Sequence, residues 1–283
     1  MTAKDVILAR KLGGGGGGTE ITDGIVVTQM GDDYRPIKAD VYGEHITPYM
    51  FRSYYHNGFY DGGWWKCEGL TFKNAKYIHD SACSTMIALK NVNTNAVINI
   101  ASNAFSGDTA LESVNMPSVE SMNLDGKVNY TDSNYAGCEF NNCTSLNIVV
   151  APKLKNLNRG TFGGCTALKT ISLPSCTYIN SRTAANNGAA FGGCTALETV
   201  EIGSAGNGIT YINNNAFYNC TQSGLTITVY TTGAYADTAL TNIRNGATNA
   251  TIIIKASEDT TYNDVAYAAG ETMITSTVEE ATT

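Results

Sequence analysis

Apolar residues recur along most of this chain in one fixed order. The clearest copy reads Phe162-Gly-Gly-Cys-Thr-Ala-Leu-Lys-Thr-Ile-Ser-Leu-Pro174, and close variants begin at Phe140 and Phe191. Counted from the Phe as position 0, Cys stands at +3, Leu at +6, a β-branched residue at +9 and an apolar residue at +11. Apolar residues return at +14 and +17. Such self-similarity indicates structural units that stack on one another.

The copies follow one another at a nearly regular spacing. They start at positions 83, 105, 140, 162, 191 and 217, so the spacings are 22, 35, 22, 29 and 26 residues. The basic unit is therefore 22 residues long, with insertions of 13, 7 and 4 residues. Cys83 replaces the Phe in the first copy, and Asp108 replaces the Cys in the second. Tyr235, Leu240 and Ile243 fit a last, decayed copy.

The alternation at +9 and +11 predicts a very short strand with one buried face. Positions +8 and +10 then point outward. One unit cannot bury its apolar face alone, so the units must stack, with strands from successive coils paired in parallel. This predicts columns of like residues: Phe140, Phe162, Phe191 and Phe217 in one, and Cys143, Cys165, Cys194 and Cys220 in another.

The cysteine column allows metal, redox or disulfide chemistry, but a buried, inert filler fits better. Stacked Cβ vectors run parallel, whereas a disulfide needs them to converge. Cys67 and Cys138 lie outside the column, and whether they pair is left open.

The unit F-x-x-C-T-x-L-x-x-I-x-L-P resembles the repeat of the BspA-like leucine-rich-repeat family of bacterial surface proteins. The resemblance covers roughly residues 69–255. It implies a mainly β or α/β solenoid, a right-handed coil with short parallel strands, capped at both ends. It also implies a bacterial or phage-encoded surface protein that binds a host protein or glycan.

The rest of the chain divides into three parts. Residues 1–18 form an N-terminal segment, in which Met1–Leu12 is compatible with one short helix, followed by a hinge of six glycines. Residues 19–68 are expected to cap the first coil. Residues 256–283 form a C-terminal cap and tail after a last strand at Thr251–Lys255, with a short helix at about Tyr262–Ala269 that Gly270 ends.

The N-terminal cap is rich in aromatic residues, with eight between Tyr49 and Trp65. Trp64 and Trp65 are adjacent, so on an extended segment they would face opposite ways. One ring could then belong to the core while the other stacks on a sugar or a protein partner. The alternative is that all of these rings pack inside the cap.

Charge and hydropathy exclude several classes of partner. The net charge is −7 and basic residues are not clustered, which argues against nucleic acid and anionic membranes. No apolar run is long enough for a membrane span, and no secretory signal is visible. The resemblance to the BspA-like family nevertheless implies an extracellular, cell-surface or virion location.

No motif for catalysis, a metal or a cofactor is present. The cysteines contain no C-x-x-C pair, the three histidines (His45, His56 and His79) have no ligand spacing, and no nucleophile elbow occurs. We therefore expect no catalytic residue, no metal and no cofactor. An enzyme with a site in residues 40–80 would need a histidine and a carboxylate in one pocket.

Two surfaces compete as the binding site. The first is the outward face of the sheet, at +8 and +10, with candidates Ile148, Val150, Thr170, Ser172, Thr199 and Glu201. Ile148 and Val150 are apolar among polar neighbours, which favours a contact site unless the preceding insertion covers them. The second consists of the insertions Asn123–Cys138 and Asn180–Ala190, the first of which carries Tyr130 and Tyr135. The alternative is that these insertions are merely tolerated loops.

Three functions follow in order of preference. The first is a non-catalytic adhesion or recognition module. The second is a structural or receptor-binding component of a phage tail-like particle, docked through Met1–Leu12. The third is the enzyme described above.

Overall fold

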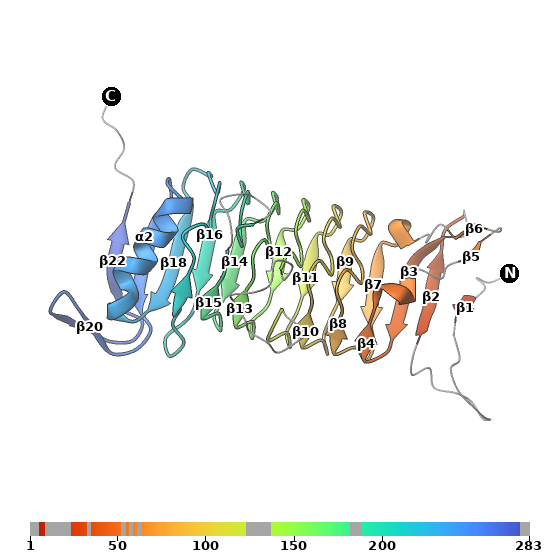
Figure 1. Ribbon diagram of the computed structural model, residues 1–283, viewed down its shortest axis with the longest axis horizontal. Coiled ribbons are helices and arrows are strands. Elements are labelled where there is room, and N and C mark those ends of the chain that lie inside the picture. The colour runs from red at the N-terminus through yellow and green to blue at the C-terminus, as the bar shows by residue number, and fades with distance from the viewer. Residues whose placement is uncertain are drawn as a thin grey trace.

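The strands of the computed structural model stack along one axis into an elongated rod, with the N-terminal strands at one end and the C-terminal strands at the other (Figure 1). The structure describes residues 24–32, 35–51, 64–122, 137–181 and 188–277, and the backbone alone at 6–8, 55–56 and 59–60. Most of the rod consists of short parallel strands, one or two per coil. The expected mainly β solenoid is therefore confirmed.

The longer strands form two sheets in succession. The first has the order β1(Val6–Leu8), β2(Gly24–Met30), β3(Pro36–Tyr42), β7(Gly69–Phe72), β9(Asn91–Asn93), β11(Ser113–Asn115) and β12(Ile148–Val150). The second has the order β14(Thr170–Leu173), β16(Thr199–Ile202), β18(Thr226–Thr231), β19(Thr251–Ala256) and β22(Thr272–Ser276).

Parallel pairing runs from β3 to β12 and from β14 to β19, while β1, β2 and β22 pair antiparallel at the two ends. The parallel ladder thus begins earlier than the sequence repeat. The expectation that strands of all successive coils pair is wrong at one step, because β12 and β14 belong to separate sheets. The coils still join at their turns there, where Phe140 N donates to Thr161 O at 2.9 Å.

A second row consists of two-residue strands. It comprises β4(His45–Ile46), β8(Tyr77–Ile78) and β10(Asn99–Ile100), then β13(Asn156–Leu157), β15(Tyr178–Ile179) and β17(Tyr211–Ile212). The strand lies at +16 and +17 in three coils; β17 is shifted to +20 and +21 by an insertion, and β4 and β8 precede the first repeat anchor. The remaining elements are α1(Pro48–Phe51), β5(Tyr55–His56), β6(Phe59–Tyr60), η1(Trp64–Lys66), η2(Gly233–Tyr235), α2(Ala236–Gly246), β20(Thr260–Tyr262) and β21(Val265–Tyr267). These short strands close the far side of each coil around one continuous core.

The phenylalanine column is aligned as the spacing predicts. The rings of Phe105, Phe140, Phe162, Phe191 and Phe217 are fully buried and stack in that order. Successive ring centroids lie 5.3, 5.7, 5.7 and 5.0 Å apart, with interplanar angles between 3° and 16°. One stack of near-parallel rings therefore links five coils.

The cysteine column has a specific role beside that stack. Each thiol donates to the carbonyl of the Phe one coil earlier, for example Cys165 Sγ to Phe140 O at 3.2 Å and Cys194 Sγ to Phe162 O at 3.1 Å. Burial raises the pKa of both thiols well above the ordinary value. All eight cysteines are free thiols, Cys67 and Cys138 included. The interpretation as small buried side chains is confirmed.

Asp108 is the exception in this column, since it places a carboxyl group where the later coils have a thiol. It is fully buried, its Oδ1 accepts from Met86 N at 2.8 Å, and its Oδ2 has no partner. Burial raises the pKa of Asp108 well above its usual range. The position therefore carries an uncompensated polar group.

Asp108→Asn is expected to stabilise the fold at neutral pH by about 1–3 kcal/mol, because the amide keeps an oxygen that accepts from Met86 N and leaves no charge to bury. Urea unfolding at neutral pH would measure the gain. Cys165→Asp, which places a carboxyl group at the same position of another coil, is the matched control and should destabilise the protein. A D108N variant no more stable than wild type would contradict this reading of the column.

The two ends depart from the sequence predictions. The helix expected at Tyr262–Ala269 is wrong: β20 and β21 form a hairpin, and Asn263 and Asp264 at its tip have φ of 49° and 63°. Two left-handed residues between strands are typical of a type I′ turn, which outweighs the helix-ending signal of Gly270. Residues 6–8 likewise form a strand, not part of a helix.

The last coil contains a helix, α2, in place of one of its sides, and the repeat spacing did not indicate it. α2 buries Ala236, Ala239 and Ile243, so Leu240 and Ile243 follow a helical period and do not form a decayed strand unit. Asp237 in its first turn and Arg244 in its last turn favour this helix through its dipole.

Candidate functional site

The outward face of the two sheets carries two rows of side chains in exact register. At +8 the register joins Asn91 to Ser113 to Ile148, and in the second sheet Thr170 to Thr199, with Thr226 next to Thr199 at +9 of its own coil. At +10 it joins Asn93, Asn115 and Val150, then Ser172 and Glu201, followed by Thr228 at +11 and by the part-buried Ile253 on β19. These rows consist of polar residues, apart from the pair Ile148 and Val150 and the part-buried Ile253.

Ile148 and Val150 form that apolar pair, and they are open to solvent. The two residues are 56% and 43% exposed, so no residue that the structure describes covers them. The alternative that the preceding insertion folds over them falls on residues 123–136, outside the described part of the chain. They lie on β12, the last strand of the first sheet, where the ladder stops. Val149 between them is buried, which fixes the two neighbours outward. The face therefore has an apolar spot at its centre with polar side chains on either side.

The polar side chains of the second sheet are tied to one another. Glu201 accepts from Ser172 Oγ at 3.5 Å and from the Tyr230 hydroxyl at 3.4 Å. Lys255 lies 5.4 Å from the centroid of the Tyr230 ring and 3.5 Å from its hydroxyl. Thr170 and Thr199 beside them are exposed. This half of the face offers a preorganised polar surface with one acidic group near its middle.

The tryptophan pair occupies η1, so its segment is not extended as the sequence analysis supposed. Trp64 is nevertheless buried against Phe51, ring centroids 5.2 Å apart and edge to face, while Trp65 is 40% exposed. The Arg35 guanidinium and the Lys66 ammonium lie 4.9 and 5.2 Å from the Trp65 ring centroid. The short helix separates the two rings as an extended strand would have done.

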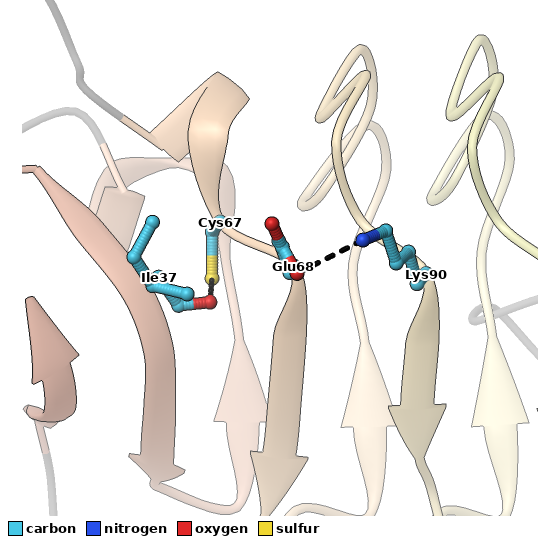
Figure 2. A network of polar contacts seen from close by, with 4 residues as sticks. All are labelled: Ile37, Cys67, Glu68 and Lys90. Carbon is cyan, nitrogen blue, oxygen red and sulfur yellow. Dashed lines mark hydrogen bonds and ion pairs between the residues drawn. The ribbon is translucent and has the colours of Figure 1, made fainter. Parts of the chain in front are cut away.

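The residues that follow η1 anchor it to the first sheet (Figure 2). The Cys67 thiol donates to Ile37 O on β3 at 3.5 Å, and Glu68 pairs with Lys90 of the next coil at 3.0 Å. Burial raises the pKa of the Cys67 thiol to about 11, so this sulfur stays protonated and can donate. The Cys67 thiol also lies 3.4 Å from Gly69 O, so this residue, which the repeat left unplaced, is buried between η1 and the start of β7.

The insertion surface lies outside the described residues. Tyr130 and Tyr135 belong to residues 123–136, and most of the second insertion belongs to residues 182–187, for which no placement is described. Their role in binding stays a prediction.

Comparison with protein-family models gives a match to the BspA-type leucine-rich repeat region, in six copies over residues 47–131 and 133–252. The match covers well over half of the chain. The chain belongs to the BspA-type leucine-rich repeat family. No curated protein matches it. Repeats of this kind typically present an extended surface to a binding partner.

One solved structure similar to this BspA-type protein is a leucine-rich cell surface protein from Faecalibacterium prausnitzii A2-165. The two sequences are 21% identical, the TM-score is 0.37, and the match covers 58% of this chain and 54% of the other. The matched part is therefore about half the length of that cell surface protein.

Two of the three histidines of this BspA-type chain, His45 and His79, lie side by side, and the side chain of His56 lies outside the described residues. His45 Nδ1 lies 3.0 Å from His79 Nε2, and burial together with the nearby His45 lowers the pKa of His79. In the described part of the chain, no three histidine, cysteine, aspartate or glutamate residues are placed to hold a metal ion. The helices described there are all too short or too polar to cross a membrane.

Sequence reasoning missed a buried acidic residue beside the first insertion. Glu139 is fully buried, and its two oxygens accept from Asn158 Nδ2 and Thr161 Oγ1, both at 2.9 Å. Burial raises its pKa to about 7. The sequence carried one signal for this burial. Glu139 occupies the position just before the Phe of its coil, and the residues at that position in three other coils, Ala104, Thr161 and Ala190, are also buried.

Proposed function

We propose that this protein is a non-catalytic recognition module, displayed outside the cell, that binds a protein partner through the outward face of its sheets. The observation that carries the proposal is the exposed pair Ile148 and Val150 at the centre of a polar, register-locked face. An apolar centre with a polar rim is the usual anatomy of a protein interface. Thr170, Ser172, Thr199 and Glu201 supply the rim on one side, Ser113 and Asn115 on the other.

The family assignment supports this proposal in general terms, because stacked repeats offer a long rigid surface whose side chains are already in place. Preorganised side chains lose little entropy on binding. The acidic Glu201 and the net charge of −7 favour a partner that presents basic groups around an apolar centre.

The experiment is a binding screen of the full chain against arrays of purified extracellular proteins and of glycans, followed by two charge variants. The double change Ile148→Lys and Val150→Lys is expected to weaken binding of a captured protein at least tenfold, because it places two cations at the apolar centre. The matched control is Ile87→Lys with Ile98→Lys, two isoleucines that are 50% and 38% exposed elsewhere. If both double variants bind the partner equally well, the outward face of the sheets is excluded as the binding site.

The particle-component alternative makes a different prediction. If Met1–Leu12 is a docking peptide, deleting residues 1–18 abolishes incorporation into a particle. Under the proposal made here, the same deletion leaves binding to the sheet face unchanged, since β12 lies far along the rod from β1 (Figure 1). Loss of partner binding on this deletion would favour the alternative.

A further inference from the structure

A hollow of about 450 Å³ lies between the N-terminal cap and the solenoid, away from the sheet face. Pro48, Phe51, Trp64 and Trp65 line it from the cap, and six residues between Asp80 and Met86 line it from the solenoid. Its volume falls within the range of roughly 300–1,000 Å³ found for small-molecule sites. Phe51 and Trp64 are core residues in contact, so the cap side of the hollow is rigid.

The solenoid side of the hollow is the open end of a hydrogen-bond ladder. Each turn donates to the turn of the next coil, as in Ser81 N to Ser102 O at 2.9 Å and Cys83 N to Ala104 O at 2.8 Å. By the 22-residue register, the carbonyls of Asp80 and Ala82 correspond to those of Ser102 and Ala104. They therefore point toward the cap, where η1 and α1 stand in place of a preceding turn.

These two carbonyls have no donor among the residues that the structure describes. A third carbonyl at this open end of the ladder, that of Ser84, accepts from the Thr85 hydroxyl at 2.6 Å. Together with the Asp80 carboxylate, the hollow offers several hydrogen-bond acceptors beside aromatic rings. Ala82 is buried and Asp80 is exposed, so of the two it is the Ala82 carbonyl that favours a ligand able to donate to it.

Thr85 is strained at the edge of this hollow. Six turns share a left-handed residue at +2, with φ between 59° and 80°: Thr85, Gly107, Asn142, Gly164, Gly193 and Asn219. The later five are Gly or Asn, which tolerate this conformation, whereas Thr is β-branched and does not. The strain costs of the order of 1–3 kcal/mol and is typical of positions retained for function.

Trp65 is held in place on the opposite side. Its carbonyl accepts from Ala88 N at 3.1 Å, and the Arg35 and Lys66 cations pack on its ring. A part-exposed indole that lines the same hollow as these acceptors suits a ligand with an apolar face and a rim of donors. A pyranose ring has both.

We propose that the hollow is a binding subsite for one neutral pyranose unit of a glycan. The sugar's C–H face packs on Trp65, and its hydroxyls donate to the carbonyls of Asp80 and Ala82 and to the Asp80 carboxylate. This site is separate from the sheet face and does not depend on it.

The test is a titration of the full chain with methyl glycosides of glucose, galactose, mannose and N-acetylglucosamine, followed by saturation-transfer NMR. At least one is expected to bind saturably, with a dissociation constant of about 1–10 mM. Trp65→Ala is expected to weaken that binding at least tenfold. Thr85→Gly is expected to raise the melting temperature and yet weaken binding, which a purely structural role for Thr85 would not produce.

Ile148→Ala is the control and should bind the glycoside as wild type does, so this test and that of the sheet face can fail separately. Circular dichroism establishes that Trp65→Ala is folded; if it is not, Thr85→Gly carries the test. The proposal is overturned if none of the four glycosides binds, or if both variants bind like wild type.

Discussion

Phe162→Ala is expected to lower the free energy of unfolding by about 3–5 kcal/mol, the largest effect of any single change proposed here. Phe162 is fully buried and lies between two rings, Phe140 and Phe191, each 5.7 Å away. The change leaves a cavity in the middle of the stack and removes two ring contacts. Because each repeat contacts only its neighbours, the change removes packing between the coils at the centre of the rod.

Phe105→Ala is the matched comparison. Phe105 is equally buried but stacks on one ring, Phe140. Its loss should be smaller than that of Phe162 by about 0.5–1.5 kcal/mol, the contribution of one aromatic pair. Urea unfolding followed by circular dichroism measures both. A loss below about 1 kcal/mol for Phe162→Ala would contradict the stacked core.

Glu139→Gln is expected to remove most of a pH-dependent loss of stability. The pKa of Glu139 is about 7 in the fold, against 4.5 ordinarily, because burial disfavours the charged form more than Asn158 and Thr161 favour it. Between these two values the unfolded chain is ionised while the folded chain keeps its proton. Wild type therefore loses stability as pH rises from 4.5 to 7, by about 3 kcal/mol, and little more from this group above pH 7.

Thermal unfolding of both proteins from pH 4 to pH 8 measures this effect. The stability of the Gln variant relative to wild type should rise across that window and then level off, since the amide does not titrate. Asp108, whose pKa burial also raises, gives a parallel trend in both proteins and cancels in the difference. Exposed Glu258→Gln is the control and should keep the wild-type profile. A constant difference at all pH values would show that Glu139 does not titrate in this range.

The columns of the core could be predicted from spacing because each residue meets its counterpart in the neighbouring coil. Phe140, Phe162 and Phe191 align for that reason, and the outward placement of Ile148 and Val150 follows from strand alternation alone. The helix α2 was missed because Leu240 and Ile243 fit a repeat frame and a helical period equally well. The hairpin of β20 and β21 was missed because the left-handed pair Asn263 and Asp264 is a weaker signal than Gly270.

The candidate surfaces divide in the same way. The sheet face was predictable residue by residue, whereas the hollow was not, because it joins Trp65 of the cap to Asp80 and Thr85 of a coil that is adjacent only in space. The exposure of Trp65 depends on η1, which local sequence did not indicate. Whether either surface binds its proposed ligand is for the variants above to decide.

What the amino-acid sequence by itself determined is the periodic part of this protein: the 22-residue unit, the stacking of coils, the residues of each column and the family. A period sets which side chains point inward, because strand geometry is local and every coil repeats it. Only the tertiary structure decided the break between β12 and β14, the burial of Asp108 and Glu139, and the hollow beside Trp65. These features depend on the distance between segments remote in sequence and on how much water remains around a charge, and no spacing along the chain encodes either.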